Sequence, residues 1–496
     1  MEELHQSSLL ESGGVRVAVQ GCGHGHLDSI YQSVQNAAES RGWDGVDLVI
    51  IGGDFQAVRN AADLTVMSVP IKYRKLGDFP EYYSGRTKAP FLTIFIGGNH
   101  EASSHSWELY YGGWVAPNIY YLGSANVLRF GPIRIAGMSG IWNDPDYNKP
   151  HIERLPFNHS NHSNHNDIKS FYHVREFDVR KLLLIREQVD IGLSHDWPKG
   201  IERYGDEEAL WRIKPFFKRG SLDGTLGSPA ATYVLDRLRP LYWFSAHMHC
   251  TFSAVKRFEV MAPASPSSEQ KPRPVSTEPS SVAPSAVSPG IPGQSVPATI
   301  FNTETKFLAL DKCGPGKKHL ELCYIKPATA ASKSASKKFI LEYDPEWLAI
   351  TRVFHQYLTI GERDAKMPAN EGENVYTEMI DKERRWVNEH IVAQDKLTVP
   401  ENFTLTAPPH NPGDPETVNS QPREYTNPQT VAFCELLQIK NLWDATSQER
   451  NHRKAQGPHR DPQPRSGNRG GRGRGKDGDR GGGHGGGGRD CSIDRP

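Results

Sequence analysis

The 496-residue sequence predicts an α/β fold: a layered α/β sandwich, followed by a smaller C-terminal α+β region and a disordered Arg/Gly-rich tail. Three observations lead to this prediction. Short apolar runs alternate with helical patterns from Val15 to about residue 258. A mixed strand and helix pattern then fills 335–445, and glycine and arginine dominate the last part of the chain.

The strands expected in the first region are short, apolar and bounded by glycine or polar turns. Runs of this kind are typical of strands buried on both faces, as in layered α/β folds. Strand-like sequence resumes later, at 306–310 and 319–325. The earlier strands are expected at Val15–Gln20, Leu48–Ile51, Phe91–Ile96, Ile133–Met138, Ile191–Leu193 and Tyr242–Ser245.

Changes in composition divide the chain. Residues 1–14 are expected to form a flexible leader, and the main domain is expected to span 15–325. Inside that domain, the Pro/Ser-rich stretch 263–298 has few large apolar side chains to offset the entropy lost on ordering. We therefore predict a disordered insertion there. A C-terminal domain is expected at 335–445, with a strand at 339–343 and apolar residues at helical spacing that suit a core.

The tail, 447–496, is of the RGG type and is expected to be disordered. From Asn451 onward it carries nine Arg and two Lys against five Asp, a net charge of +6. Such a segment suits RNA association through charge and arginine stacking. A solubilising tail or a protein-interaction segment explains the composition equally well.

Overall composition excludes several classes of protein. The 58 basic and 58 acidic side chains balance, and the six cysteines form no CxxC pair, which argues against a disulfide framework or a cysteine-only zinc module. The sequence shows neither a secretory signal nor an apolar run long enough for a membrane span. We expect a soluble intracellular monomer with no membrane partner.

Five polar clusters each follow an expected strand through a tight turn of small residues. Because loops at the carboxyl ends of such strands converge at one edge of a sheet, these side chains should meet. A single histidine or Gly-Asp turn is usually structural, but five in this order are not readily accidental. The clusters contain Cys22 and His24, then Asp54, then Asn99 and His100, then His195, and finally His247 and His249.

This donor set fits a hydrolase that uses two metal ions. Asp54 is the carboxylate placed to bridge the ions, which would activate water and stabilise the phosphoryl oxygens. His100 is left to orient the phosphate or to protonate the leaving oxygen. We predict one metal held by Cys22, His24, Asp54 and His249, and another held by Asp54, Asn99, His195 and His247.

Longer stretches of sequence carry a family resemblance. The order of GD, GNHE and a final HMH resembles the calcineurin-like metallophosphoesterase superfamily, which implies an α/β/β/α sandwich. Within it, "GCGHGHLDSIY", "GGDFQAVRN", "YGGWVAPNIYYLG" and "TKFLALDKC" resemble the RNA lariat debranching enzyme family. The similarity runs from about Val15 to Cys313 and continues more thinly to about residue 440.

In that family a cysteine is the expected residue at the first ligand position. A thiolate is softer than a carboxylate, so Cys22 favours Fe²⁺ or Zn²⁺, with Mn²⁺ as an alternative and one or two ions per chain. Inert packing of a buried cysteine is the competing interpretation.

The resemblance also implies the reaction. It is metal-dependent hydrolysis of the 2′–5′ phosphodiester at the branch point of excised lariat introns, which linearises them for turnover during mRNA processing. Branched intron RNA is then the partner, splicing-related proteins are further candidates, and the nucleus is the expected location. Two alternatives stay open: another calcineurin-like phosphoesterase acting on phosphoproteins or nucleotides, and a non-catalytic RNA-binding scaffold.

A long irregular stretch, 139–170, resembles the lariat recognition loop of the family. Aromatic, amide and basic side chains in its first half suit stacking on splayed bases and bonding to 2′-hydroxyls. An ordinary surface excursion is the alternative. Trp114, Asn118 and Tyr120 are likewise assigned to either the cleft or the core. The expected RNA contacts in the loop are Trp142, Asn143, Tyr147, Lys149 and His151.

Overall fold

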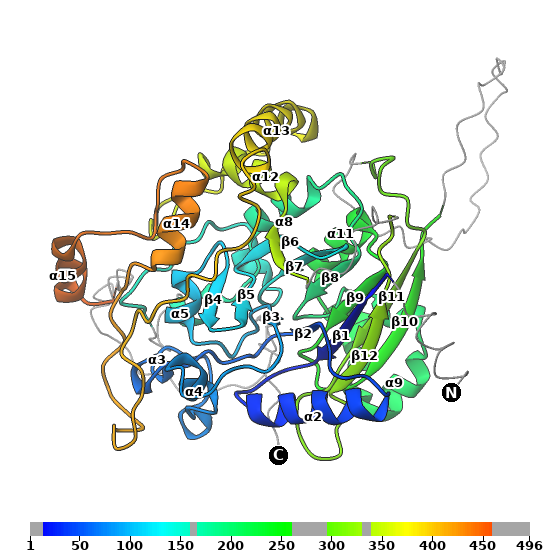
Figure 1. The fold of residues 1–496 in the computed structure, drawn as a ribbon, viewed down its shortest axis with the longest axis horizontal. Coiled ribbons are helices and arrows are strands. Elements are labelled where there is room, and N and C mark those ends of the chain that lie inside the picture. The colour runs from blue at the N-terminus through cyan, green and yellow to red at the C-terminus, as the bar shows by residue number, and fades with distance from the viewer. Residues whose placement is uncertain (1–12, 159–165, 260–294, 330–338, 459–496) are drawn as a thin grey trace, which may run out of the picture. The chain divides into compact units, whose positions relative to one another are not determined.

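A computed structural model describes residues 13–158, 166–259, 295–329 and 339–458. These described residues belong to one compact unit. Two β-sheets in this unit share a hydrophobic core, and helices cover their outer sides (Figure 1). The predicted mixed α/β class with layered sheets is confirmed.

The first sheet has mostly parallel strands. Its members are β1 (Val15–Gln20), β2 (Leu48–Ile51), β3 (Thr93–Phe95), β4 (Gly113–Ala116), β5 (Ile119–Tyr121) and β12 (Leu320–Ile325). Their spatial order is β12-β1-β2-β3-β5-β4, and β1, β2, β3 and β5 run parallel. The late strand β12 pairs antiparallel with β1, so distant parts of the sequence complete one sheet.

The second sheet is built in the same way. Its members are β6 (Ala125–Phe130), β7 (Ile133–Met138), β8 (Ile191–Ser194), β9 (Tyr242–Ser245), β10 (Phe252–Arg257), β11 (Glu304–Ala309) and β13 (Leu341–Tyr343). Their order is β10-β11-β9-β8-β7-β6-β13, with β7, β8, β9 and β11 parallel. Strand β13 lies at the far edge, beside β6.

Successive residues of β1 face different layers of the sandwich. Val17 and Val19 pack in the core shared with the second sheet, whereas Ala18 packs with Ile30 and Val34 of α2 (Leu27–Ser40). This alternation is the period of two that a strand imposes. Because both faces of the strand are covered, its residues Val17, Ala18 and Val19 form a continuous apolar run, which explains why the sequence identifies the strand.

The remaining helices are short and lie mainly in the connections between strands (Figure 1). They are α3 (Ala61–Leu64), η1 (Ile71–Tyr73), α4 (Phe79–Tyr83), α5 (Ser103–Glu108), α6 (Asp144–Tyr147), α7 (Asp167–Phe171), α8 (Glu176–Leu183), η2 (Ile201–Tyr204), α9 (Glu207–Ile213), α10 (Pro215–Asp223), α11 (Pro229–Leu238), α12 (Pro345–His355), α13 (Glu373–Val387), η3 (Asn388–Val392), α14 (Pro428–Leu436) and α15 (Ser447–Gln456).

The region after residue 339 is joined to the second sheet by a buried ion cluster. Asp344 caps α12 by accepting a hydrogen bond from the Trp347 N–H, and its carboxylate also binds Arg134 of β7 at 2.6 Å. Arg134 also contacts Glu346, at 2.8 Å. The C-terminal region therefore contributes both a strand and a buried anchor to the sandwich, while the predicted boundaries 15–325 and 335–445 stay predictions.

Sequence analysis missed four strands. Strands β4 and β5 form a short hairpin, and β6 and β10 carry polar residues among apolar ones. In the hairpin, Trp114 and Tyr120 are buried in the core, and the Trp114 indole N–H donates to the Pro400 carbonyl. Asn118 turns the hairpin with φ of 68°. Of the two assignments, the structure supports the core for Trp114 and Tyr120, while Asn118 is half-buried at the turn.

The tail prediction needs a correction at its start, because residues 447–456 form α15. Thr446 and Glu449 make a capping box, in which each side chain accepts the other residue's backbone N–H. The remaining tail from 459, most of the leader (1–12) and most of the Pro/Ser-rich stretch (263–294) lie outside the described residues. None of the described helices has the length and apolarity that a membrane span requires.

Candidate metal centre

The side chains predicted as ligands follow the carboxyl ends of parallel strands in both sheets. Loops after β1, β2 and β3 carry Cys22, His24, Asp54 and Asn99, and loops after β8 and β9 carry His195, His247 and His249. The two sets meet where the sheets adjoin, as expected for a site at the carboxyl edge of α/β sheets.

Four of these residues form a tight cluster. Each of Cys22, His24, Asp54 and His249 offers one donor atom, and these atoms all lie within 4.8 Å of one another. The Nε2 atoms of His24 and His249 are 3.1 Å apart. This sulfur, nitrogen and oxygen donor set is one that divalent transition metals accept.

Asp54 belongs to this cluster and also lies beside a second group of donors. That second group is the set predicted for the other metal: Asn99, His195 and His247. The Oδ2 of Asp54 is 3.7 Å from His24 Nε2, and its Oδ1 is 3.4 Å from His195 Nε2. Each oxygen of the carboxylate thus faces a different histidine, an arrangement that allows Asp54 to bridge two ions. His100 is also held here, with its backbone N–H donating to Oδ1 at 2.9 Å.

Two buried atoms in the second group fit a cation. The Nδ1–H of His195 donates to the Gly52 carbonyl at 2.7 Å, so Nε2 carries the lone pair. That Nε2 and Asn99 Oδ1 are both buried without a hydrogen-bond partner among the described residues. Unpaired buried acceptors are costly, and a bound cation would satisfy both. The His247 ring lies beside His195, with centroids 5.0 Å apart.

Burial sets the protonation of the cluster. It lowers the pKa of His24 to about 4 and that of His249 to about 2, so both imidazoles are neutral at pH 7, the state that binds metals. Burial alone would raise the pKa of Asp54, but the neighbouring histidines, His100 first, bring that pKa below its ordinary value. Burial and the Asp54 charge raise the pKa of the Cys22 thiol, so a cation is needed to hold its thiolate.

The backbone is strained at four candidate ligands. His24, Asp54, His247 and His249 have φ values of 48°, 47°, 61° and 47°, in the left-handed region that side-chain-bearing residues seldom adopt. The loops after β1 and β2 are joined by a backbone hydrogen bond, in which the Gly23 N–H donates to the Gly53 carbonyl at 3.0 Å. Strain of this kind commonly marks functional sites.

Two glycines permit the close approach of these loops. A Cβ at Gly53 would lie 2.2 Å from His195 Nδ1, and one at Gly98 would lie 2.2 Å from Asp54 Oδ1. Gly53 also has φ of 111°. Close packing therefore requires glycine at positions 53 and 98, and the backbone conformation requires it at Gly53 as well.

Glu101 is a site residue that sequence analysis missed. Its carboxylate accepts hydrogen bonds from the backbone N–H groups of Phe55, Gln56 and Gly98, at 2.8, 2.8 and 2.9 Å. It thereby fixes the Asp54 loop to the Asn99 loop. Burial, followed by the charge of Asp54, raises its pKa to about 7. The GNHE motif contained this residue, but two of its three partners, Phe55 and Gln56, lie more than forty positions earlier.

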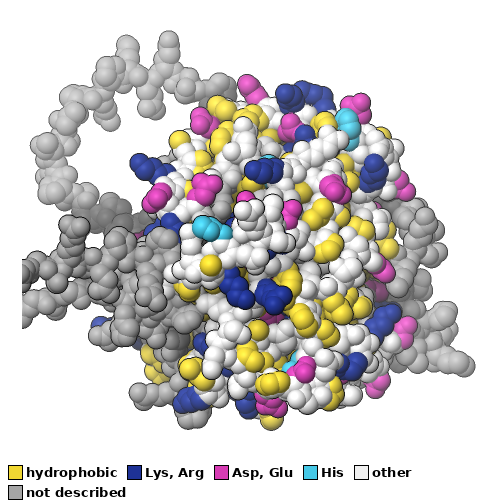
Figure 2. Space-filling model, turned by 90° about the vertical axis from the view of Figure 1, so that its left-hand side faces the viewer, with side chains coloured by type: hydrophobic (Ala, Val, Ile, Leu, Met, Phe, Trp, Pro, Cys, Tyr) yellow, Lys and Arg dark blue, Asp and Glu magenta, His cyan; other side chains and the backbone are white. Residues whose placement is uncertain are grey.

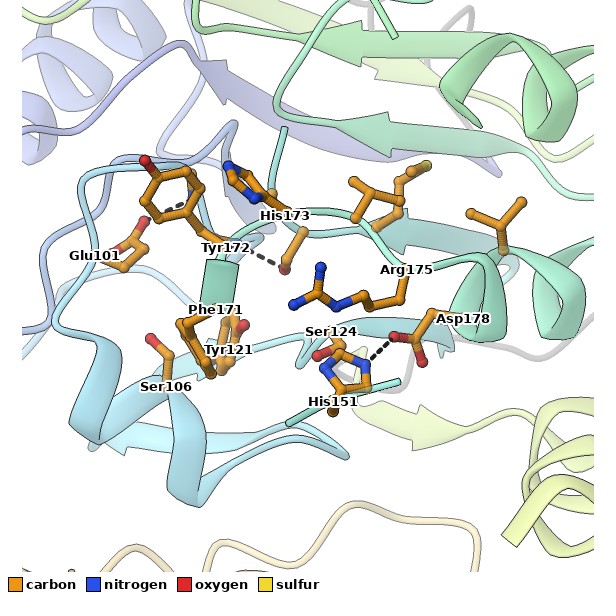
Figure 3. A pocket seen from close by; sticks show the side chains of 17 residues that line it. Glu101, Ser106, Tyr121, Ser124, His151, Phe171, Tyr172, His173, Arg175 and Asp178 are labelled. Carbon is orange, nitrogen blue, oxygen red and sulfur yellow. Dashed lines mark hydrogen bonds and ion pairs between the residues drawn. The ribbon is translucent and has the colours of Figure 1, made fainter. Parts of the chain in front are cut away.

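The predicted RNA contacts separate into two groups. Four of them occupy one turn around α6: the rings of Trp142 and Tyr147 are 4.7 Å apart, Asn143 caps the helix, and Lys149 pairs with Asp146 at 2.7 Å. His151 is instead buried, with Nε2 2.7 Å from Asp178 Oδ2 (Figure 3). The structure thus places four of the five on a half-buried surface and the fifth behind it. Residues 159–165 of this stretch lie outside the described residues.

A cavity of about 30 Å³ lies behind the Asn99 loop, lined by Glu101, His151 and Arg175 among others (Figure 3). The Arg175 Nε is buried there without a hydrogen-bond partner among the described residues. This volume holds a water molecule but is too small for a nucleobase.

Comparison with known proteins identifies the family. Residues 15–251 match the model of the calcineurin-like phosphoesterases, and residues 302–442 match "Lariat debranching enzyme, C-terminal domain". The lariat debranching enzyme of Schizosaccharomyces pombe is 43% identical over 467 residues, covering 86% of this chain and 96% of that protein. The chain belongs to the lariat debranching enzyme family.

Two other members of the family match a similar share of this chain. The lariat debranching enzyme of Arabidopsis thaliana is 42% identical over 87% of this chain and 88% of its own length. The human enzyme is 42% identical over 86% of this chain and 70% of its own length. As a lariat debranching enzyme family member with a calcineurin-like domain, the protein is a metal-dependent phosphodiesterase that uses divalent ions.

Proposed function

We propose that the protein hydrolyses the 2′–5′ phosphodiester at the branch point of excised lariat introns. The products are a linear intron with a 5′-phosphate and a branch nucleotide with a restored 2′-hydroxyl. The observation that carries the proposal is Asp54, whose two oxygens face separate histidine groups, in a chain of this family.

The donor set supports two binding positions for divalent ions. Fe²⁺ or Zn²⁺ suits the imidazoles and the soft thiolate of the first position, with Mn²⁺ as the alternative. Bound ions supply Lewis acidity to the phosphoryl oxygens and activate water for attack on phosphorus. We assign the first position to Cys22, His24, Asp54 and His249, and the second to Asp54, Asn99, His195 and His247.

Protein groups then orient and protonate the substrate. His100 Nδ1 lies 3.4 Å from Asp54 Oδ2, which leaves Nε2 for the substrate. From there it can hold the scissile phosphate and deliver a proton to the leaving 2′-oxygen. Glu101 keeps the two ligand loops at a fixed separation.

The surface around α6 suits the bases next to the branch. Trp142 and Tyr147 provide stacking faces, Asn143 provides polar atoms for base edges, and Lys149 provides a cation for phosphate. His151 is buried and pairs with Asp178, so we do not assign it an RNA contact. We further propose that the protein works as a monomer in the nucleus, where introns are released, alongside splicing-related proteins.

Three substrates test the proposal on full-length protein purified without oxygen and loaded with Fe²⁺, Zn²⁺ or Mn²⁺. We expect cleavage of a 2′–5′-branched RNA and little cleavage of the matched linear 3′–5′ RNA or of p-nitrophenyl phosphate. Equal activity on all three would instead indicate a general phosphoesterase. Binding of branched RNA without cleavage under every metal would indicate a scaffold. Metal analysis of the same preparation identifies the ions.

A further inference from the structure

The loop between β11 and β12 brings an unassigned lysine to the edge of the metal centre. The Cys313 N–H donates to the Cys22 carbonyl at 3.2 Å. On the other side of Lys312, a Cβ at Gly21 would lie 2.1 Å from the Asp311 carbonyl oxygen. Contacts on both sides of Lys312 therefore fix its backbone against the strand end that presents the first ligand.

The Lys312 ammonium has no carboxylate partner within ion-pair distance among the described residues, although an acidic residue precedes it. One oxygen of Asp311 accepts the backbone N–H of Lys312 at 2.7 Å, and the other pairs with Lys317 at 3.2 Å. The Lys312 side chain is half-buried. With no carboxylate within ion-pair distance among the described residues, the ammonium is available to an anionic ligand.

The backbone on either side of Lys312 contacts Gly21 and Cys22, in the loop after β1. Lys312 therefore lies on the Cys22 side of the metal centre.

We infer that Lys312 binds a backbone phosphate of the branched RNA at the Cys22 side of the metal centre. A branch nucleotide carries three phosphates, at its 5′, 3′ and 2′ oxygens, so cleavage of one leaves two more anions close to the ions. A loop lysine at the edge of the ligand cluster can neutralise one of these anions as a point charge. This inference rests on the proposed function and names a substrate contact for it.

The test compares Lys312→Ala and Lys312→Arg with Lys318→Ala in full-length metal-loaded protein. Lys318 is a matched control because it lies on the same loop, is exposed and has the same charge. Steady-state cleavage of branched RNA is measured at several salt concentrations. We expect Lys312→Ala to raise KM about tenfold with kcat nearly unchanged. The slope of log(kcat/KM) against log[salt] should fall by about 0.7 to 1, as for the loss of one phosphate contact. Lys312→Arg should keep the slope.

Metal content and the thermal midpoint of each variant are measured alongside and should match those of the unaltered protein. The inference is overturned if Lys312→Ala keeps the original KM and salt slope, if Lys318→Ala changes them equally, or if Lys312→Ala loses activity only through loss of metal. Failure of the unaltered protein to cleave branched RNA would refute the proposed function itself. The two failures are therefore distinguishable.

Discussion

The backbone N–H of His247 donates a hydrogen bond to the Sγ atom of Cys22 over 3.2 Å. This contact joins the loop after β9, in the second sheet, to the loop after β1, in the first. A sulfur that accepts a backbone hydrogen bond is stabilised as thiolate. The contact therefore favours the thiolate form of Cys22 and links loops from the two sheets at the candidate metal centre.

Replacing Cys22 with serine should weaken the first metal position. A neutral hydroxyl is a poorer ligand than a thiolate for Fe²⁺ or Zn²⁺, so we expect affinity there to fall by more than about tenfold. Cobalt-loaded protein provides a direct measurement, since the thiolate-to-cobalt absorption should disappear. Cys434→Ser, another buried cysteine, should leave that absorption intact. An unchanged spectrum in Cys22→Ser would show that the thiol packs without coordinating.

Gly53→Ala should displace His195 and abolish metal binding at the second metal position. The added methyl would lie 2.2 Å from His195 Nδ1, on a backbone with φ of 111°. We expect a loss of about 2–4 kcal/mol in unfolding free energy, from overpacking and strain combined, together with loss of one metal equivalent in titrations. Gly42→Ala isolates the strain, because its φ is 75° and nothing lies within 4 Å. An equal effect of the two substitutions would contradict the role of Gly53.

Glu101→Gln should loosen the two ligand loops. The carboxylate accepts three backbone N–H groups, and an amide NH₂ in its place would face at least one of them as a second donor. We expect a cost of about 2 kcal/mol in urea unfolding and weaker metal binding. Glu81→Gln, at a half-exposed carboxylate, serves as the control and should change neither quantity measurably.

His100→Ala should separate binding from turnover. The ring contributes no ligand to either proposed metal position, so metal content and affinity for branched RNA should stay within about twofold of the original. Without a proton donor for the leaving oxygen, kcat should fall by about 10² to 10⁴. Single-turnover cleavage with pre-bound RNA measures this fall. Full activity in the variant would remove His100 from the reaction.

Asp344→Asn should reduce stability in a pH-dependent way. Burial alone would raise the pKa of Asp344, but the guanidinium of Arg134, followed by that of Arg129, brings it below its ordinary value. Such a group stabilises the fold above its unfolded pKa of about 4, and this contribution is lost as the pH falls toward the folded pKa. We expect a loss of about 3–5 kcal/mol at pH 7, which shrinks between pH 5 and pH 3. Urea midpoints at these pH values measure it, and a constant difference would refute the linkage.

Sequence patterns predicted the parts of the site that follow from topology. Strands such as Val15–Gln20 are apolar because both their faces are covered, and polar residues after parallel strands must meet at one edge. The partners of Glu101 and His151 could not be predicted in this way. Their hydrogen bonds reach Phe55 and Asp178, which only the folded chain brings near. The capping box at Thr446 was present in the sequence but was obscured by the composition of the tail.

Charge on the surface is as mixed as the overall composition suggests. On the face seen in Figure 2, acidic and basic side chains are interspersed and neither sign dominates. Attraction of RNA by this face should therefore be weak and sensitive to salt.

The antiparallel ladder of β10 and β11 ends with Arg257 opposite Glu304. The chain thus leaves and re-enters the second sheet at neighbouring points, and the ladder itself fixes the distance between them. A fluorescent protein grafted between these two strands should leave catalysis undisturbed, because its fusion points are already adjacent. This position offers a route to imaging the enzyme in living cells.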